Sequence, residues 1–180
     1  MAVQIGARPD AGFDDPLGML RDCHRRIENF LRVLCHVAEN QHEGPLGAEE
    51  RNAVRSALEY FRTGGQRHTL DEEESLFPRM HAARAGDCLN ALARLEEEHD
   101  EANRLHAEID SLFLDWIESG QMSNARRESL RAAVGRLRSL YNEHIRVEEE
   151  VVFPGAAERL TPDALAAMGA EFRARRQPLA

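Results

Sequence analysis

The sequence lacks long apolar stretches and strand-like runs. No part of this 180-residue chain approaches the ~18 consecutive apolar residues that a membrane span requires. The first ten residues, MAVQIGARPD, lack the apolar core of a secretory signal peptide. Runs rich in Val, Ile, Thr and aromatic residues are nearly absent, which argues against a β-rich fold. We therefore expect a cytoplasmic protein with no membrane partner.

Cysteine is also scarce. The three cysteines, Cys23, Cys35 and Cys88, are an odd number and have no metal-like spacing. This pattern excludes a disulfide framework and a cysteine-based zinc site. We expect three free, buried thiols.

Positive charge is in deficit. Lys and Arg together number 23 against 32 for Asp and Glu, which gives a net charge of -9. Such a chain repels polyanions, so a nucleic acid or an acidic membrane surface is not expected as a partner. A cation or a basic ligand suits it better.

Glycine and proline are sparse within long stretches rich in Ala, Leu, Glu and Arg, so the chain is expected to be all-α. Apolar residues at alternating spacings of three and four predict helices at about 14–40, 48–78, 89–118 and 124–152. The segment TPDALAAMGAEFRARR predicts one further short helix that begins at its Thr-Pro pair. Long amphipathic helices with short connections favour an antiparallel four-helix bundle with a short C-terminal helix.

The length and composition favour one folded unit. We divide the chain into a flexible N-terminal tail (1–13), a four-helix bundle (14–160), and a short C-terminal helix and tail (161–180).

An internal repeat organises the chain. HIRVEEEVVFP at 144–154 matches HTLDEEESLFP at 68–78 in six of eleven positions. A lone histidine also precedes the two motifs by 45 and 44 residues, at His99 and His24 respectively. The bundle is therefore expected to consist of two pseudo-repeated helical hairpins.

The repeated motif has the spacing of a metal site. Each motif places a glutamate four residues after its histidine, and such residues lie on one helix face about 6 Å apart along the axis. Pairing the hairpins would bring four imidazoles and two carboxylates together, a set for two metals in which each ion takes two histidines and the glutamates bridge. The candidate metal ligands are His24, His68, Glu72, His99, His144 and Glu148.

The alternative for any one of these histidines is a hydrogen-bonded core residue. A core that held all six residues without a metal would be costly, however, because buried polar groups need partners. Imidazole together with carboxylate suits iron, so we expect two iron ions, with manganese or zinc less favoured.

Other polar residues near the motifs are weaker candidates. The following glutamates are expected on a solvated face or in support of the ligands: Glu73, Glu74, Glu149 and Glu150. His106 lies about 10 Å along the helix axis from His99, which favours a core or supporting role over a ligand. Three further histidines, His36, His42 and His81, are expected to be exposed or terminal.

Tyr141 is a candidate for supporting the reaction at the centre. It lies one turn before His144 on the inward face, where the first repeat has Gly65. Its hydroxyl could donate a hydrogen bond to a small ligand held at the centre, in the space that Gly65 leaves. The alternative is an ordinary packed aromatic residue.

These motifs resemble the hemerythrin family, in particular its bacterial stand-alone branch with the HHE cation-binding domain. The resemblance covers about residues 14 to 177 and rests on the order H…HxxxE…H…HxxxE and on the LFP or VFP that closes each motif. It implies that the six candidate residues bind a non-haem di-iron centre.

The chain departs from oxygen-carrying hemerythrins at two positions. Those proteins have a fifth histidine one turn after the ligand of the third helix, where this chain has Asn103. Their last carboxylate is an aspartate five residues after the histidine, whereas Glu148 follows His144 by four. Both differences argue against reversible oxygen carriage and leave metal binding intact.

The function implied is binding of, or reaction with, oxygen, peroxide or nitric oxide at open metal positions. One alternative is an iron, oxygen or redox sensor, or an iron-handling protein, without catalysis. Another is a di-iron protein like those of iron–sulfur cluster repair, although residues 1–13 lack the cysteine of that group. The sequence leaves open whether the protein is an enzyme, and its oligomeric state.

Overall fold

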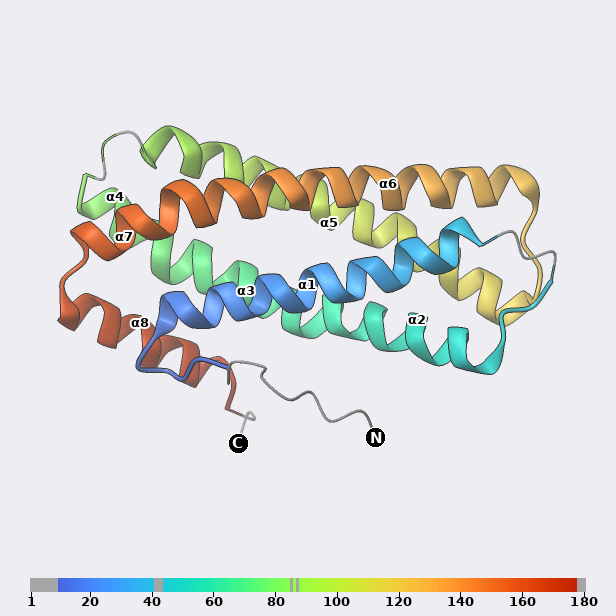
Figure 1. Ribbon diagram of the computed structural model, residues 1–180, viewed down its shortest axis with the longest axis horizontal. Coiled ribbons are helices and arrows are strands. Elements are labelled where there is room, and N and C mark those ends of the chain that lie inside the picture. The colour runs from blue at the N-terminus through green and yellow to red at the C-terminus, as the bar shows by residue number, and fades with distance from the viewer. Residues whose placement is uncertain (1–9, 41–43, 85, 87, 178–180) are drawn as a thin grey trace.

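Long helical rods lie side by side, and each runs back along the one before it (Figure 1). The computed structural model describes residues 10–40, 44–84, 86 and 88–177, and within these the chain has helices and no strands. The all-α prediction is confirmed. The first rod is α1 (Pro16–Glu39); the second joins α2 (Ala48–Tyr60), η1 (Phe61–Gly65), α3 (Gln66–Asp71), η2 (Glu72–Leu76) and α4 (Phe77–Ala82); the third is α5 (Cys88–Ser119); the fourth joins α6 (Asn124–Val147), η3 (Glu148–Val152) and α7 (Phe153–Arg159); and α8 (Pro162–Ala174) follows.

Capping residues fix where the helices begin. The side chain of Asp15 accepts a hydrogen bond from the Gly18 amide (2.9 Å), and Pro16 occupies the first position of α1. Ser123 caps α6 and Thr161 caps α8 in the same way. These side chains satisfy amide groups that a helix leaves without partners in its first turn.

The second and fourth rods contain widened π-helical turns. The turns η2 and η3 begin at Glu72 and Glu148 and end two residues before Pro78 and Pro154. Proline has no amide hydrogen, and its ring clashes with the carbonyl four residues earlier in a regular helix. A wider turn accommodates this proline. The Phe-Pro that closes each motif therefore accounts for the π-helical turn that begins at the glutamate of the same motif.

The apolar core is divided into two clusters by a polar layer. On α1, Leu20 belongs to one cluster and Ile27 to the other; on α5, Leu95 and Ala102 are divided in the same way. The buried histidines of these two helices lie between the members of each pair. The bundle therefore holds its buried charge between two regions that exclude water.

At both ends of the described part of the chain, side chains bind the bundle. Asp10 binds Arg26 of α1 (2.7 Å), whereas residues 1–9 of the expected tail lie outside the described residues. At the other end, Arg175 and Arg176 bind the fully buried Asp71 at 2.8 and 2.6 Å. The C-terminal helix is thereby fixed against the rod that carries the first motif.

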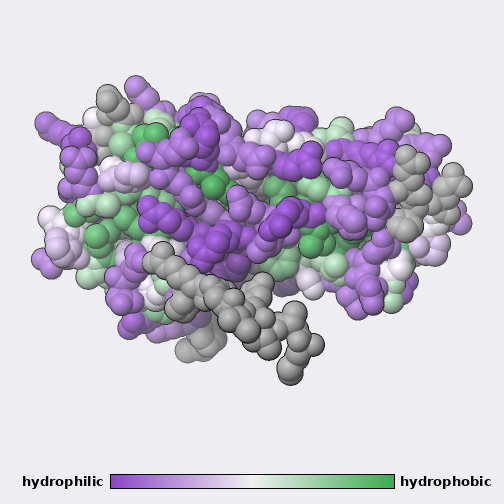
Figure 2. Space-filling model, viewed as in Figure 1, coloured by the Kyte–Doolittle hydropathy of each residue, from purple (hydrophilic) through white to green (hydrophobic). Residues whose placement is uncertain are grey.

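The face shown in Figure 2 is mostly hydrophilic, with hydrophobic side chains visible between the rods. Among the described residues, Leu70 and Val151 are the large apolar side chains that are exposed. None of the described helices has both the length and the apolar character needed to cross a membrane. The three cysteines are buried and free, as predicted.

Candidate metal centre

The structure brings all six candidate ligands together in the polar layer. Each is at least 95% buried, and both glutamates are completely buried. Their ligand atoms form two groups, within each of which all atoms lie within 4.8 Å of one another. The groups are His24, His68, Glu72 and Glu148, and Glu72, His99, His144 and Glu148. The two glutamates therefore belong to both groups.

Glu72 directs one oxygen toward each group. Its Oε1 lies 3.4 Å from Nε2 of His68, one helical turn away on the same rod. Its Oε2 lies 3.5 Å from Nε2 of His99 on α5. A carboxylate placed in this way can bridge two metal ions.

Glu148 is placed in the same way from the opposite rod. Its Oε1 lies 3.3 Å from Nε2 of His144, and its Oε2 lies 3.1 Å from Nε2 of His24 on α1. The ring nitrogens of His99 and His144 also approach each other, with Nε2 atoms 3.1 Å apart. The two repeats thus contribute equivalent atoms to one compact centre.

The donor set fits a pair of cations. Both oxygens of Glu72 and of Glu148, together with Nε2 of His24, are buried without a hydrogen-bond partner in the described part of the chain. The distances from these carboxylate oxygens to the imidazole nitrogens are short, but their geometry is not that of hydrogen bonds. Leaving such atoms buried and unpaired costs about 1–3 kcal/mol each, or more when they are charged. Bound metal ions would satisfy them together.

Without metal ions the cluster contains both repelling and attracting charges, and the pKa values of its members diverge. Burial and the neighbouring charge of Glu148 raise the pKa of Glu72 well above its usual value. Burial lowers the pKa of His68 well below its usual value, and the nearby His24 lowers it further. Burial also lowers the pKa of His144, but nearby carboxylates outweigh this effect and raise it to about 9. Cations between the groups would stabilise ionised glutamate and neutral histidine together.

Comparison with known proteins identifies the family. A family model for the hemerythrin HHE cation binding domain matches residues 15–156. The chain belongs to the hemerythrin family. An uncharacterized protein of Haemophilus influenzae is 28% identical to it over 167 residues, which cover 93% of each chain. The resemblance inferred from the duplicated motif is confirmed.

In this hemerythrin chain, carboxylates outside the cluster orient three of the four histidines. Glu149 lies 2.9 Å from Nδ1 of His24, and Glu73 lies 2.8 Å from Nδ1 of His99. The hydrogen bond with His24 lowers the pKa of Glu149. Such a carboxylate holds the proton on Nδ1 and leaves Nε2 free to bind a metal. Of the two roles considered for these glutamates, support of the ligands matches the contacts.

The third carboxylate, Glu98, did not emerge from the sequence. It lies 3.0 Å from Nδ1 of His144, and its pKa is lowered by that hydrogen bond. The residue that corresponds to Glu98 in the first repeat is Cys23, since each immediately precedes the histidine of its first helix. Accordingly, Nδ1 of His68 has no hydrogen-bond partner among the described residues. The sequence did carry a signal for this role, because the residue before the lone histidine is a carboxylate in the second repeat and a cysteine in the first.

The phenylalanine of each Phe-Pro pair stacks on the lone histidine of the other hairpin. Phe153 lies 5.3 Å from His24, ring centre to ring centre, with nearly parallel planes. Phe77 lies 6.1 Å from His99 with nearly parallel planes. These contacts fix the rings of the two lone histidines and give the closing Phe-Pro a second purpose.

The remaining candidates lie around the centre or on the surface. The hydroxyl of Tyr141 is hydrogen-bonded to Nε2 of His106 (3.0 Å), and the Tyr141 ring meets His144 edge to face at 6.3 Å. The exposed Asn103 accepts a hydrogen bond from Gln66 (3.0 Å). Glu74 and Glu150 bind arginines. His36 and His81 are exposed, as expected, and His42 lies outside the described residues.

Proposed function

We propose that the four histidines and two glutamates bind two iron ions, and that this centre binds or reacts with a small molecule such as oxygen, peroxide or nitric oxide. The observation that carries this proposal is the sharing of Glu72 and Glu148 by two buried groups of ligand atoms. Imidazole and carboxylate oxygen together suit iron better than an all-oxygen or a thiolate set would. When bound, a pair of irons supplies open coordination positions and changes of oxidation state.

The protein's own residues would prepare this chemistry. Glu149, Glu73 and Glu98 hold the imidazole rings in one orientation, and Phe77 and Phe153 pack against two of them. The apolar clusters on both sides keep bulk water out of the centre. Exclusion of water strengthens electrostatic interactions and limits side reactions.

The first test is the metal content of protein purified from iron-supplied cells, with absorption spectra of the oxidised form before and after azide is added. We expect two irons per chain and a new absorption band with azide. His24→Ala and His99→Ala, one from each group, should lower the iron content, whereas His36→Ala on the exposed face of α1 should not. Zinc alone, or no metal after anaerobic loading with iron, would refute the proposal. Turnover of peroxide or nitric oxide by the iron-loaded protein would establish an enzyme.

A second candidate, an iron or redox sensor, is favoured by the contacts of the C-terminal helix. Arg175 and Arg176 bind Asp71, which is adjacent in sequence to Glu72. A change at the centre that moves Glu72 would therefore act on the anchor of α8. Hydrogen exchange of α8 in iron-loaded and metal-free protein tests this candidate. Equal exchange in the two forms would count against sensing through this helix.

A further inference from the structure

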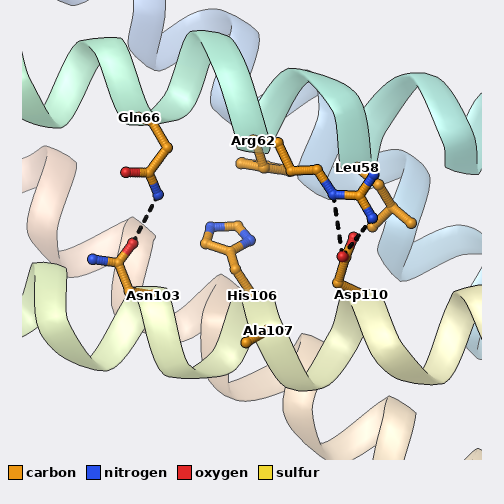
Figure 3. A pocket seen from close by; sticks show the side chains of 8 residues that line it. Leu58, Arg62, Gln66, Asn103, His106, Ala107 and Asp110 are labelled. Carbon is orange, nitrogen blue, oxygen red and sulfur yellow. Dashed lines mark hydrogen bonds and ion pairs between the residues drawn. The ribbon is translucent and has the colours of Figure 1, made fainter.

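A groove with polar and apolar walls lies beside the candidate centre, between the second rod and α5 (Figure 3). Its volume is about 180 Å³, many times the ~10–15 Å³ that a cavity needs to hold one water molecule. Two cross-links span it: Gln66 donates to Asn103 (3.0 Å), and Arg62 donates to Asp110 (3.1 Å). The ring of His106 lies between these cross-links. The space is suited to a molecule of a few heavy atoms.

The floor of the groove leads toward the centre through two hydrogen-bonded side chains. His106 packs on Phe61, with ring centres 4.4 Å apart, and its Nε2 meets the hydroxyl of Tyr141 at 3.0 Å. On its other side Tyr141 contacts the ring of His144. His106 and Tyr141 thus separate the groove from the centre.

The backbone differs between the repeats at this place. The groove wall includes η1, a π-helical turn that ends at Gly65, three residues before His68. The corresponding segment of the second repeat is regular helix and places Tyr141 where the first has Gly65. π-Helical turns occur frequently at functional sites. The two repeats therefore differ, in backbone and in side chain, at the segments that flank the path from the groove to the centre.

We propose that this groove is the route by which a small ligand reaches the metal centre, and that the paired side chains of His106 and Tyr141 form the gate at its inner end. The proposal rests on the proposed function, because it presumes a centre that binds small molecules. Rotation of the His106 side chain would free the Tyr141 hydroxyl and open the passage. The ligand class is a diatomic or triatomic molecule, which fits between the cross-links.

A second groove touches Tyr141 from the side of α1 and α6. It has a volume of about 270 Å³ and is lined by residues that include Arg32, Arg138 and Asn142. The groove at His106 is favoured because its floor is bonded directly to the hydroxyl of Tyr141. The second groove provides the matched control.

The experiment measures azide binding to oxidised, iron-loaded protein by stopped-flow absorption, after the iron content and the melting temperature of each variant have been confirmed. Ala107→Trp fills the proposed route from an exposed position on α5, and Asn142→Trp fills the second groove from an exposed position on α6. An obstructed route slows entrance and exit equally, so Ala107→Trp should lower both rate constants about tenfold or more and leave Kd unchanged. Asn142→Trp should leave both constants within about twofold of the wild type.

His106→Ala tests the gate in the opposite direction and should accelerate association and dissociation together. Wild-type rates in both Ala107→Trp and His106→Ala would overturn the route, as would slowing by Asn142→Trp alone. A change in Kd without matched changes in both rate constants would show altered binding at the centre and would also overturn it. A wild-type protein that takes up no iron would refute the proposed function itself, which separates the two failures.

Discussion

The carboxylates hydrogen-bonded to Nδ1 of the histidines predict that the two proposed metal positions differ in affinity. The group with His99 and His144 has two such partners, Glu73 and Glu98, at 2.8 and 3.0 Å. The other group has one, Glu149, because the histidine on its second rod lacks a partner at Nδ1. We therefore expect the position between His99 and His144 to bind metal more tightly.

Replacing these glutamates by glutamine removes the charge and keeps the shape. Loss of such a partner typically weakens metal affinity by about 10–100-fold, which corresponds to about 1.4–2.7 kcal/mol. The double variant Glu73→Gln/Glu98→Gln should weaken its position by about 10²–10⁴-fold if the two effects add. Glu149→Gln should weaken the other position by about 10–100-fold.

Anaerobic titration with Fe²⁺ against a competing chelator gives the affinity of each binding step and the number of metals per chain. The double variant should lose the tighter step, and Glu149→Gln should lower the affinity of the weaker one. Glu74→Gln and Glu150→Gln are matched controls from the same acidic runs, since these carboxylates bind arginines instead of histidines. Equal weakening by the control variants, or unchanged affinity in the double variant, would refute the reasoning.

Three further predictions concern stability. Asp71→Ala should destabilise the protein by about 2–3 kcal/mol and lower Tm by roughly 4–12 °C. Breaking a wholly buried ion pair would cost more, but the two arginines that bind Asp71 are partly exposed. Gly169→Ala should lower Tm, because an added Cβ would overlap the carbonyl oxygen of Phe13, whereas Gly135→Ala, with open space around it, should raise stability by about 0.5–1 kcal/mol. Burial lowers the pKa of His106 to about 4, so on acidification the unfolded chain binds a proton at this histidine before the folded protein does. The free energy of unfolding should therefore fall as the pH drops from about 6.5 toward 4. His106→Gln should reduce this fall, as measured by calorimetric melts at several pH values.

Much of the centre could be predicted because helix geometry is local. The spacing of four between His68 and Glu72 places both on one face whatever the rest of the chain does. The repeat predicts the second half of the set, and two long-range expectations complete it: the helices within each hairpin pack together, and the two hairpins pair. The structure brings these side chains together within two groups of ligand atoms.

The contacts that escaped prediction depend on how neighbouring helices are rotated against each other. Glu98 lies on α5 but binds His144 on α6, 46 residues later. The bond between His106 and Tyr141 likewise joins two helices, and no spacing within either helix encodes it. A periodic pattern shows which face of a helix is inward, whereas partners across helices follow from packing at the level of single side chains.

The differences between the repeats are as informative as their agreement. Identical positions supply the candidate ligands, so two repeats alone would make two equivalent metal positions. Three differences between the repeats remove this equivalence. Where the second repeat has Glu98, which binds a histidine, the first has Cys23; where the second has Tyr141 near the groove, the first has Gly65. Where the first repeat has Asp71, which anchors α8, the second has Val147. Each places a polar side chain in one hairpin where the other has a small or apolar one, and each adjoins the centre. The proposed route, by which a ligand enters from a single side, requires the two halves of the centre to differ in this way.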